Sequence, residues 1–244
     1  MKTNQALKHT LVQQQQNFAS IVPVDFQKDP YVVFDFSIHN PELQTIDLRD
    51  VAKMKQYIAK ALSAKNAKVG VGGYAEERNL YQRSENYETE QGARCIHLGI
   101  DLWMPAGTPV FAPLQAQVHS FQNNDLFADY GPTIILEHHL EGFTFYTLYG
   151  HLSLDSLEGL YEGKPIQKGE KIGAMGTELE NGAWAPHVHF QLITDMMSKK
   201  GDFIGVTSKE EKEKYLEICP DPNWVLGVKG VVKGVVKGVL RNTL

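Results

Sequence analysis

The chain has few cysteines and no long apolar run, and these absences exclude several classes of protein. Two cysteines, Cys95 and Cys219, are too few for a disulfide framework. No apolar stretch reaches the roughly 20 residues that a membrane-spanning helix needs. A formal net charge of −5 gives no indication of a nucleic-acid partner. The N-terminal residues carry no apolar signal segment, so we expect a cytoplasmic protein, with a secreted or periplasmic location as the alternative.

Residues 1–66 predict an α/β extension. The Gln-rich stretch 4–19 is typical of a polar helix, and YVVFDFS (31–37) has the β-branched and aromatic content of a strand. Asp47 can cap a second helix that continues to about residue 64, because apolar residues recur there at helical spacing.

Residues 67–206 predict an antiparallel β-sheet domain. Short apolar runs alternate with turn residues such as Glu141-Gly142 and Asn181-Gly182, which is typical of hairpins. No helical pattern separates these runs, so a parallel βαβ sheet is not expected. The fold class is therefore mainly β, or α+β when the extension is included. The expected strands are VGVGGY (69–74), HLGIDLW (97–103), TPVFAPLQAQVHSF (108–121), TIILEHH (133–139), FTFYTLYGHL (143–152), GEKIGAMG (169–176) and HVHFQLI (187–193).

Residues 207–244 predict a short helix followed by a tail. TSKEEKEKYLEI (207–218) is charged and helical in pattern, with Thr207 or Ser208 as the N-cap. The segment 228–240 repeats V-V-K-G about three times, and glycine at every fourth position opposes a helix. We expect a loosely ordered or edge-strand tail rather than a membrane-binding segment, because its basic residues are few.

A histidine and an aspartate lie on one short motif, HLGID (97–101). Side chains alternate between the two faces of a strand, so His97, Gly99 and Asp101 share one face of the predicted strand. The glycine leaves room for a metal ion between an imidazole and a carboxylate, which are ordinary zinc ligands. Leu98 and its apolar neighbours are expected to enter the core from the other face.

Three further histidines lie on two other predicted strands. HVHF (187–190) places His187 and His189 on one face, roughly 6–7 Å apart along the strand. That separation suits one histidine on a metal and the other beside it, near a substrate. His151 ends the run FTFYTLYGHL directly after Gly150, which allows a bend.

Each of these motifs alone also has an ordinary structural explanation. A single histidine at a strand end, such as His151, is more often structural or solvated than catalytic. An H-x-H pair also arises by chance. Together, however, the motifs supply a candidate metal centre with further imidazoles nearby. His138 and His139 are adjacent on one strand and point to opposite faces, so they are not expected to share a site.

The order of the motifs resembles the lysostaphin/LytM family of zinc endopeptidases. The first matching run corresponds to the family's H-x-G-x-D and P-x-G-T-P-V-x-A segments, and later runs correspond to its Y-x-H-L, G-x-x-I-G-x-x-G and P-H-L-H-F segments. The resemblance covers about residues 93–195. The matching segments are IHLGID (96–101), PAGTPVFA (105–112), YGHL (149–152), KGEKIGAMG (168–176) and PHVHF (186–190).

This resemblance implies a zinc ion held by His97, Asp101 and His189, with His151 and His187 as catalytic residues beside the open coordination position. Zinc in such sites lowers the pKa of bound water to about 7. The implied reaction is hydrolysis of a peptide or amide bond by metal-activated water, with the two histidines assisting proton transfer. The implied partner is a peptide or amide substrate such as a peptidoglycan cross-link.

Three further features bear on the substrate. The family uses a tyrosine upstream of its first motif, and Tyr81 and Tyr87 are both candidates for it. TELENGAWA (177–185) replaces a Gly/Ser/Thr-rich stretch that lines the family's cleft. GDFIGV (201–206) and CPDPN (219–223) resemble an intracellular branch whose module lies beside phosphotransferase and class III aminotransferase domains, which implies a small cytosolic metabolite as the substrate.

Two alternatives remain open. A catalytically silent, zinc-binding regulatory module would keep the fold, although such proteins usually lose a ligand or a catalytic histidine, and all five positions are filled here. A purely structural zinc site usually has four protein ligands. Cys95, on the same predicted face as His97, is the candidate for the fourth.

Overall fold

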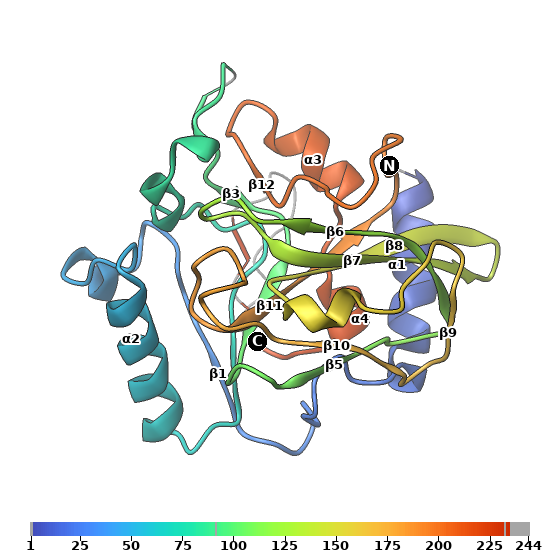
Figure 1. Cartoon of the computed structure of the whole chain (residues 1–244), viewed down its shortest axis with the longest axis horizontal. Helices are drawn as coiled ribbons and strands as arrows, with labels where there is room; N and C mark the ends of the chain where they lie inside the picture. Colours follow the sequence, from blue (N-terminus) through green and yellow to red (C-terminus); the bar gives the residue numbers. More distant parts are fainter. Residues whose placement is uncertain (1, 91, 232, 235–244) are drawn as a thin grey trace.

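The main feature of the fold is a large, mostly antiparallel sheet (Figure 1). A computed structural model describes residues 2–90, 92–231 and 233–234. Within these residues the main sheet has eight strands, in the order β1-β2-β4-β11-β8-β7-β6-β9, and β5 with β10 and β3 with β12 form two smaller sheets. The strands are β1 (Tyr31–Val33), β2 (Val69–Val71), β3 (Ile96–His97), β4 (Ile100–Trp103), β5 (Pro109–Phe111), β6 (Ala116–Asn124), β7 (Gly131–Leu140), β8 (Phe143–Gly150), β9 (Pro165–Ile166), β10 (Lys171–Ala174), β11 (His187–Ile193) and β12 (Val206–Thr207).

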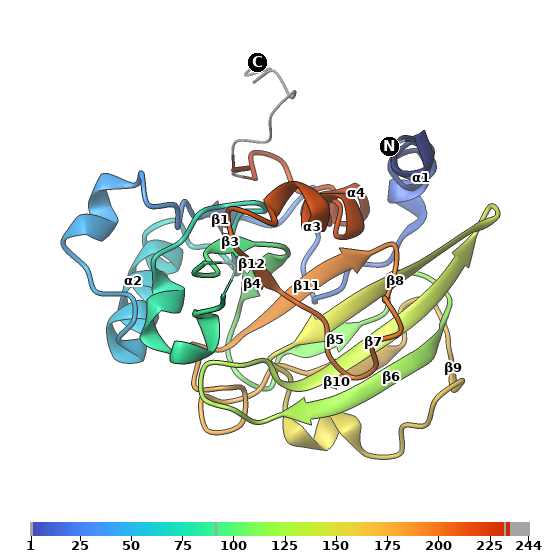
Figure 2. The same cartoon turned by 90° about the horizontal axis from the view of Figure 1, so that it is seen from above.

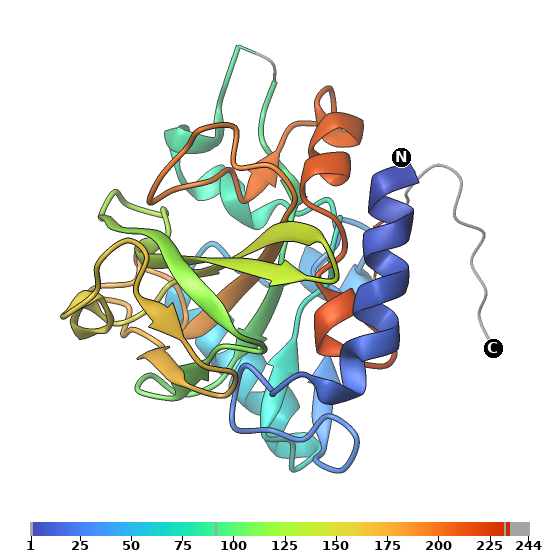
Figure 3. The same ribbon diagram turned by 90° about the vertical axis from the view of Figure 1, so that its right-hand side faces the viewer.

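Helix α2 connects the parallel strands β1 and β2, whereas α1, α3 and α4 precede or follow the strands of the main sheet in the chain. In two perpendicular views, α1 and α2 occupy opposite flanks of the molecule (Figures 1 and 2). Helix α1 runs beside α4 (Figure 3). Directly after α1, Gln15 Nε2 donates hydrogen bonds to the carbonyl oxygens of Asn223 and Trp224 in α4. The α-helices are α1 (Lys2–Gln14), α2 (Val51–Ala64), α3 (Lys212–Ile218) and α4 (Asn223–Leu226), and the short 3-10 helices are η1 (Gln15–Asn17), η2 (Pro41–Gln44), η3 (Leu80–Arg83), η4 (Glu85–Tyr87) and η5 (Leu154–Leu157).

Strands β6, β7 and β8 form the expected antiparallel hairpins. β7 and β8 are joined at Glu141 and Gly142, whose φ angles of +48° and +83° are those of a tight two-residue hairpin turn. The mainly β fold class predicted from the sequence is thereby confirmed. The exception is β1, which pairs with β2 in parallel at the edge of the sheet.

The two-residue period of the strands determines which side chains reach the main core. In β7, Ile134 and Leu136 join the largest apolar cluster, whereas Ile135 joins a separate cluster on the other face. In β11, Val188 and Phe190 belong to the largest cluster. The histidines between and before them therefore project from the opposite face, where the candidate site lies.

The N-terminal extension differs from the prediction in detail. Helix α2 is capped by Asp50, whose Oδ1 accepts hydrogen bonds from the amides of Ala52 and Lys53, so the predicted cap at Asp47 is wrong by three residues. Asp47 instead pairs with Arg49. α1 ends at Gln14 and continues only as the 3-10 helix η1, and β1 comprises the first part of the predicted strand 31–37.

The C-terminal segment begins with a strand before its helix. Thr207 belongs to β12 and pairs with Ile96 of β3, so the helix starts at Lys212 and Thr207 is not its cap. Ser208 Oγ accepts a hydrogen bond from the Glu211 amide. Much of the predicted tail, residues 232 and 235–244, lies outside the described residues. The division into 1–66, 67–206 and 207–244 stays a prediction.

The extension and the sheet share one apolar cluster beside the candidate site. Met54 and Ile58 of α2 pack in the same cluster as Trp103 of β4 and Tyr81. Helix α2 therefore helps to wall the region in which the site residues lie. In the part of the chain that the structure describes, no helix is both long enough and apolar enough to span a membrane.

Candidate metal centre

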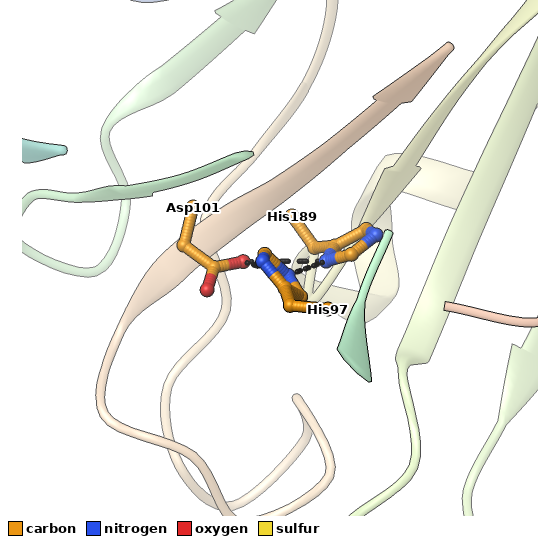
Figure 4. Close-up of side chains that lie close together, drawn as sticks. All are labelled: His97, Asp101 and His189. Carbon is orange, nitrogen blue, oxygen red and sulfur yellow. Dashed lines mark hydrogen bonds and ion pairs between the residues drawn. The ribbon is translucent and has the colours of Figure 1, made fainter. Parts of the chain in front are cut away.

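Three side chains from separate strands point toward one another (Figure 4). They are His97 of β3, Asp101 of β4 and His189 of β11, and all three are buried. His97 Nε2 lies 2.9 Å from His189 Nδ1, and Asp101 Oδ1 lies 3.2 Å from each of these two nitrogens. The structure thus brings together the three residues that the sequence singled out as metal ligands.

The sheet register makes Asp101 and His189 direct neighbours. β4 and β11 run antiparallel, and Asp101 pairs with His189 across them. The predicted continuous strand 97–103 is wrong, because the chain breaks between β3 and β4 and β3 pairs with β12 instead of joining the main sheet. Leu98 consequently packs in a different cluster from the apolar residues of β4, and His97 approaches the other two ligands from outside the main sheet.

Gly99 makes room for an imidazole rather than directly for an ion. A Cβ atom at position 99 would lie 2.4 Å from His189 Cε1 and 2.9 Å from the Phe190 carbonyl oxygen. The space that the sequence pattern left between His97 and Asp101 is therefore filled by the His189 ring. A side chain at this position would prevent β11 from approaching so closely.

Hydrogen bonds on the outer side of each imidazole fix its tautomer. His97 Nδ1 donates to the Gly73 carbonyl oxygen at 2.9 Å, and His189 Nε2 donates to Gln191 Oε1 at 2.8 Å. The Gln191 amide is oriented by its own Nε2, which donates to the Ile204 carbonyl oxygen. When neutral, both histidines therefore direct an unprotonated nitrogen toward the centre.

The donor set fits a zinc ion. Two imidazole lone pairs and one carboxylate oxygen face one another at separations of 2.9–3.2 Å, an arrangement that a cation stabilises. Bond lengths of about 2.0–2.2 Å around a tetrahedral zinc ion place neighbouring ligand atoms about 3.3 Å apart, so one ion can reach all three atoms with little movement. Outer hydrogen bonds to the ligating imidazoles are the usual support of such centres.

Burial and nearby charges together determine the protonation states of Asp101 and His97. Burial alone raises the pKa of Asp101, but His97 and Arg78 outweigh it and hold the pKa well below its ordinary value. Burial, with Arg78 second, lowers the pKa of His97 to about 4. Both groups are therefore in the protonation state that metal binding requires at neutral pH.

His151 and His187 lie together beside the three ligands. Their ring centroids are 4.2 Å apart, and His187 Nε2 lies 3.8 Å from Asp101 Oδ1. His151 Nδ1 donates to the Asn181 carbonyl oxygen and His187 Nδ1 donates to the Ala185 carbonyl oxygen. Burial lowers the pKa of both histidines, that of His151 well below its ordinary value, so each holds an unprotonated Nε2 at neutral pH.

His151 is held in a backbone conformation that few residues adopt. Its φ is +62°, in the left-handed region, and its amide donates to the Tyr130 carbonyl oxygen at 2.7 Å. Such strain in a residue other than glycine costs on the order of 1–3 kcal/mol and is concentrated at functional sites. This conformation turns the chain at the end of β8 and places the imidazole against His187.

A cavity of about 330 Å³ opens over the five predicted residues. Tyr81 and Tyr87 both line it, so the structure does not choose between the two candidate tyrosines by position. Tyr81 is 5% exposed and its hydroxyl oxygen accepts a hydrogen bond from Arg78, whereas the Tyr87 hydroxyl donates to the Ala128 carbonyl oxygen. Tyr81 therefore keeps its own proton available for a ligand in the cavity. The roles of all these residues stay predictions.

Sequence reasoning missed the residues that surround the ligands. Arg78, Glu76 and Gln191 are almost completely buried and contact the centre directly or through one another. Tyr130 also lies beside it, with its hydroxyl 3.3 Å from His189 Nε2. The segment that contains Arg78 is rich in charge and resembles a solvated surface, so its pattern carries no signal of burial. For Gln191, the two-residue period after His189 would have been a usable signal.

The cysteines and the adjacent pair His138 and His139 do not belong to the candidate metal centre. Cys95 and Cys219 are free, and Cys95 does not belong to the metal-capable group found among the described residues. His138 is buried and His139 is exposed, as expected for neighbours on one strand.

Comparisons with known proteins identify the region that carries the site. The model of a family described as Peptidase family M23 matches residues 95–213. Peptidoglycan DD-endopeptidase ShyA of Vibrio cholerae is 31% identical over 97 residues, which are 40% of this chain and 20% of that protein. A protein of Haemophilus influenzae named an uncharacterized metalloprotease is 30% identical over 125 residues, 48% of this chain and 24% of that protein. The chain thus spans about a quarter or less of the length of these curated relatives.

A likeness to solved structures was also found. The catalytic domain of the antimicrobial peptidase lysostaphin from Staphylococcus simulans shares 24% identity with a TM-score of 0.38, and the match covers 62% of this chain and 92% of that one. A zinc-containing peptidase from Vibrio cholerae shares 27% identity with a TM-score of 0.33, over 41% of this chain and 28% of that one.

Proposed function

We propose that the chain hydrolyses a peptide or amide bond with a zinc ion held by His97, Asp101 and His189, on the premise that residues 95–213, which the model of peptidase family M23 matches, form a hydrolase domain of that family. The observation that carries the proposal is the convergence of three buried ligand atoms within 3.2 Å, with both imidazole protons on the outer nitrogens. A bound zinc ion would supply Lewis-acid chemistry, polarising a carbonyl group and making water more acidic.

The two remaining histidines handle the protons of the reaction. His151 and His187 hold unprotonated Nε2 atoms over the cavity, because each Nδ1 is engaged by a backbone carbonyl oxygen. Their depressed pKa values keep them able to accept a proton from the attacking water and to return it to the leaving amine. The hydroxyl of Tyr81, which accepts from Arg78, is free to donate to a substrate oxygen.

The relatives and the cavity support two candidate substrates. The name of ShyA describes a peptidoglycan endopeptidase, which supports a peptide substrate, and a peptidoglycan cross-link is the first candidate. The cavity favours a second candidate, an amide of a small metabolite. Its walls include Met54 of α2 and Tyr81, both N-terminal to the family match, and its volume of about 330 Å³ is at the small end for a ligand site.

One experiment tests the activity and also separates it from a silent binding module. We expect purified protein to contain one zinc ion and to hydrolyse a member of a panel that sets pentaglycine and peptidoglycan cross-links against small amides. His187→Ala should lower kcat by about 10²–10⁴-fold with the zinc content unchanged, because it removes a proton acceptor. His139→Ala, on an exposed histidine, is the matched control.

Zinc-loaded protein that is inert on the whole panel would support the silent module. Activity that survives His187→Ala unchanged would remove that histidine from the reaction. Protein that takes up no zinc would overturn the proposal as a whole.

A further inference from the structure

The two oxygens of Asp101 have different partners. Oδ1 faces His97 Nε2 and His189 Nδ1, each at 3.2 Å. Oδ2 points away from them and accepts a hydrogen bond from Arg78 Nη1 at 2.6 Å. A guanidinium-to-carboxylate bond of this length is among the strong hydrogen bonds of proteins. One oxygen is therefore committed to Arg78 and the other faces the proposed metal position.

Arg78 is itself fixed from the opposite side. It is 1% exposed, and its Nε and Nη2 lie 2.9 Å and 2.8 Å from Glu76 Oε2. Glu76 is 0% exposed and also accepts from the amides of Gly73 and Phe36. Every oxygen of Glu76 thus accepts a hydrogen bond, and its charge compensates that of Arg78 in the interior.

The same network reaches a second proposed ligand. The Gly73 carbonyl oxygen accepts from Arg78 Nη2 at 3.0 Å and from His97 Nδ1 at 2.9 Å. Arg78 therefore contacts Asp101 directly and contacts His97 through a shared backbone acceptor. A buried ion pair this expensive to desolvate stabilises the fold little by itself, but it fixes two ligands in one geometry.

We propose that Arg78, held by Glu76, is a positioning residue of the metal centre, and that it occupies Oδ2 of Asp101 so that only Oδ1 is presented to the ion. This inference rests on the proposed function, because it takes Asp101 as a ligand. The planar guanidinium bridges Glu76 and Asp101 with separate nitrogens. A lysine ammonium at position 78 carries the same charge but lacks the planar set of N–H donors that reaches both carboxylates. It therefore leaves Oδ2 free to turn toward the metal.

The test measures metal binding rather than turnover. Zinc dissociation constants are obtained by chelator competition for wild type, Arg78→Lys and the double variant Glu76→Gln/Arg78→Gln, which removes both charges of the Glu76–Arg78 pair and leaves the zinc ion as the cationic partner of Asp101. We expect both variants to bind zinc 10–100-fold more weakly. With cobalt(II) in place of zinc, their visible absorption spectra should change, because a second carboxylate oxygen enters the coordination sphere.

A matched control separates positioning from general destabilisation. Ile134→Ala removes a fully buried side chain of β7 from the main core and touches none of the network. It should lower the midpoint of thermal unfolding and leave the zinc affinity and the cobalt spectrum of the folded protein unchanged. If Arg78→Lys does not fold, the double variant provides the same two readouts.

Three outcomes would count against the inference or its premise. Variants with wild-type zinc affinity and cobalt spectra would overturn the role of Arg78 while leaving the proposed metal centre intact. If the double variant had an altered zinc affinity and cobalt spectrum while Arg78→Lys resembled wild type, the positive charge alone would matter. This result would overturn the role of the planar guanidinium group. Wild-type protein that binds no zinc would instead overturn the proposed function, and the inference with it.

Discussion

Gly99 shows how much the candidate centre depends on one absent side chain. A Cβ atom there would lie 2.4 Å from His189 Cε1, so His189 must shift if a side chain is added. We expect Gly99→Ala to weaken zinc binding at least about tenfold, because mutations of residues that orient a metal ligand typically cost this much in affinity. Chelator competition measures this directly.

Gly70→Ala is the matched control for that change. Its Cβ would meet the Phe34 ring at the same distance, 2.4 Å, but touches no proposed ligand. Both variants should lose stability, and only Gly99→Ala should lose zinc affinity. Equal zinc affinities in the two variants would show that the close approach of β11 to Gly99 does not matter for the metal.

The buried imidazole of His138 should make the stability of the fold depend on pH, independently of the metal centre. Burial lowers its pKa to about 4 from an ordinary value of 6.5. Because the unfolded chain binds a proton more readily, the stabilisation is complete above pH 6.5 and is lost as the pH falls toward 4. The loss amounts to about 3 kcal/mol between pH 7 and pH 4.

The measurement is urea unfolding of chelator-treated protein across this pH range. His138→Gln cannot be protonated, so its free energy of unfolding should fall by about 3 kcal/mol less than that of wild type. Taking the difference between the two proteins cancels the contributions of all other titrating groups. Parallel curves for the two proteins would contradict the depressed pKa.

At the scale of elements, three connecting segments meet at Arg83. Its guanidinium lies 4.8 Å from the Phe127 ring centre and 4.6 Å from that of Trp184. Its Nε and Nη1 have no hydrogen-bond partner among the described residues, so stacking is its main contribution. We expect Arg83→Ala to lower the free energy of unfolding by about 1–2 kcal/mol. KM should rise as well, because Trp184 lines the cavity.

Arg49→Ala is the control for Arg83→Ala. Arg49 is exposed and pairs with exposed Asp47, so its removal should change stability by less than about 1 kcal/mol. Urea unfolding and steady-state kinetics provide the two measurements. If Arg83→Ala left both stability and KM as in wild type, the stacked arrangement would not hold the cavity wall.

The positions of the strands in the chain were predictable from the sequence, but the pairing of the strands in the sheet was not. Short apolar runs bounded by turn residues in 133–139, 143–152 and 187–193 indicated β7, β8 and β11. The pattern of one strand says nothing about which strand lies beside it. The pairing of β11 between β4 and β8 therefore came only from the structure.

At the scale of the whole molecule, the sequence was enough to propose the five histidine and aspartate positions of the candidate site. The buried residues that hold these side chains in place could not be predicted. Residue type and spacing are enough to propose ligands, since few side chains bind zinc. Buried partners such as Glu76 and Arg78 look like surface residues in the sequence, because their burial depends on each other and on Asp101, 23 residues beyond Arg78. The cytoplasmic location likewise stays a prediction.

Removal of the metal is the test that involves the whole fold. The proposed ligands link β3, β4 and β11, and His97 and His189 are 92 residues apart in the chain. An ion that binds only the folded state stabilises it by about 4 kcal/mol when its free concentration is a thousand times its dissociation constant. We therefore expect zinc to raise the midpoint of thermal unfolding of chelator-treated protein by several degrees.

Asp101→Asn should abolish most of that increase, because the amide is a far weaker ligand than a carboxylate. The variant also removes one of the two anionic partners of Arg78 and will unfold earlier in the absence of metal, so the quantity to compare is the zinc-dependent increment of each protein. His139→Ala should keep the full increment, since its exposed ring lies outside the metal-capable group. A wild-type midpoint that does not respond to zinc would contradict a metal bridge between β3, β4 and β11.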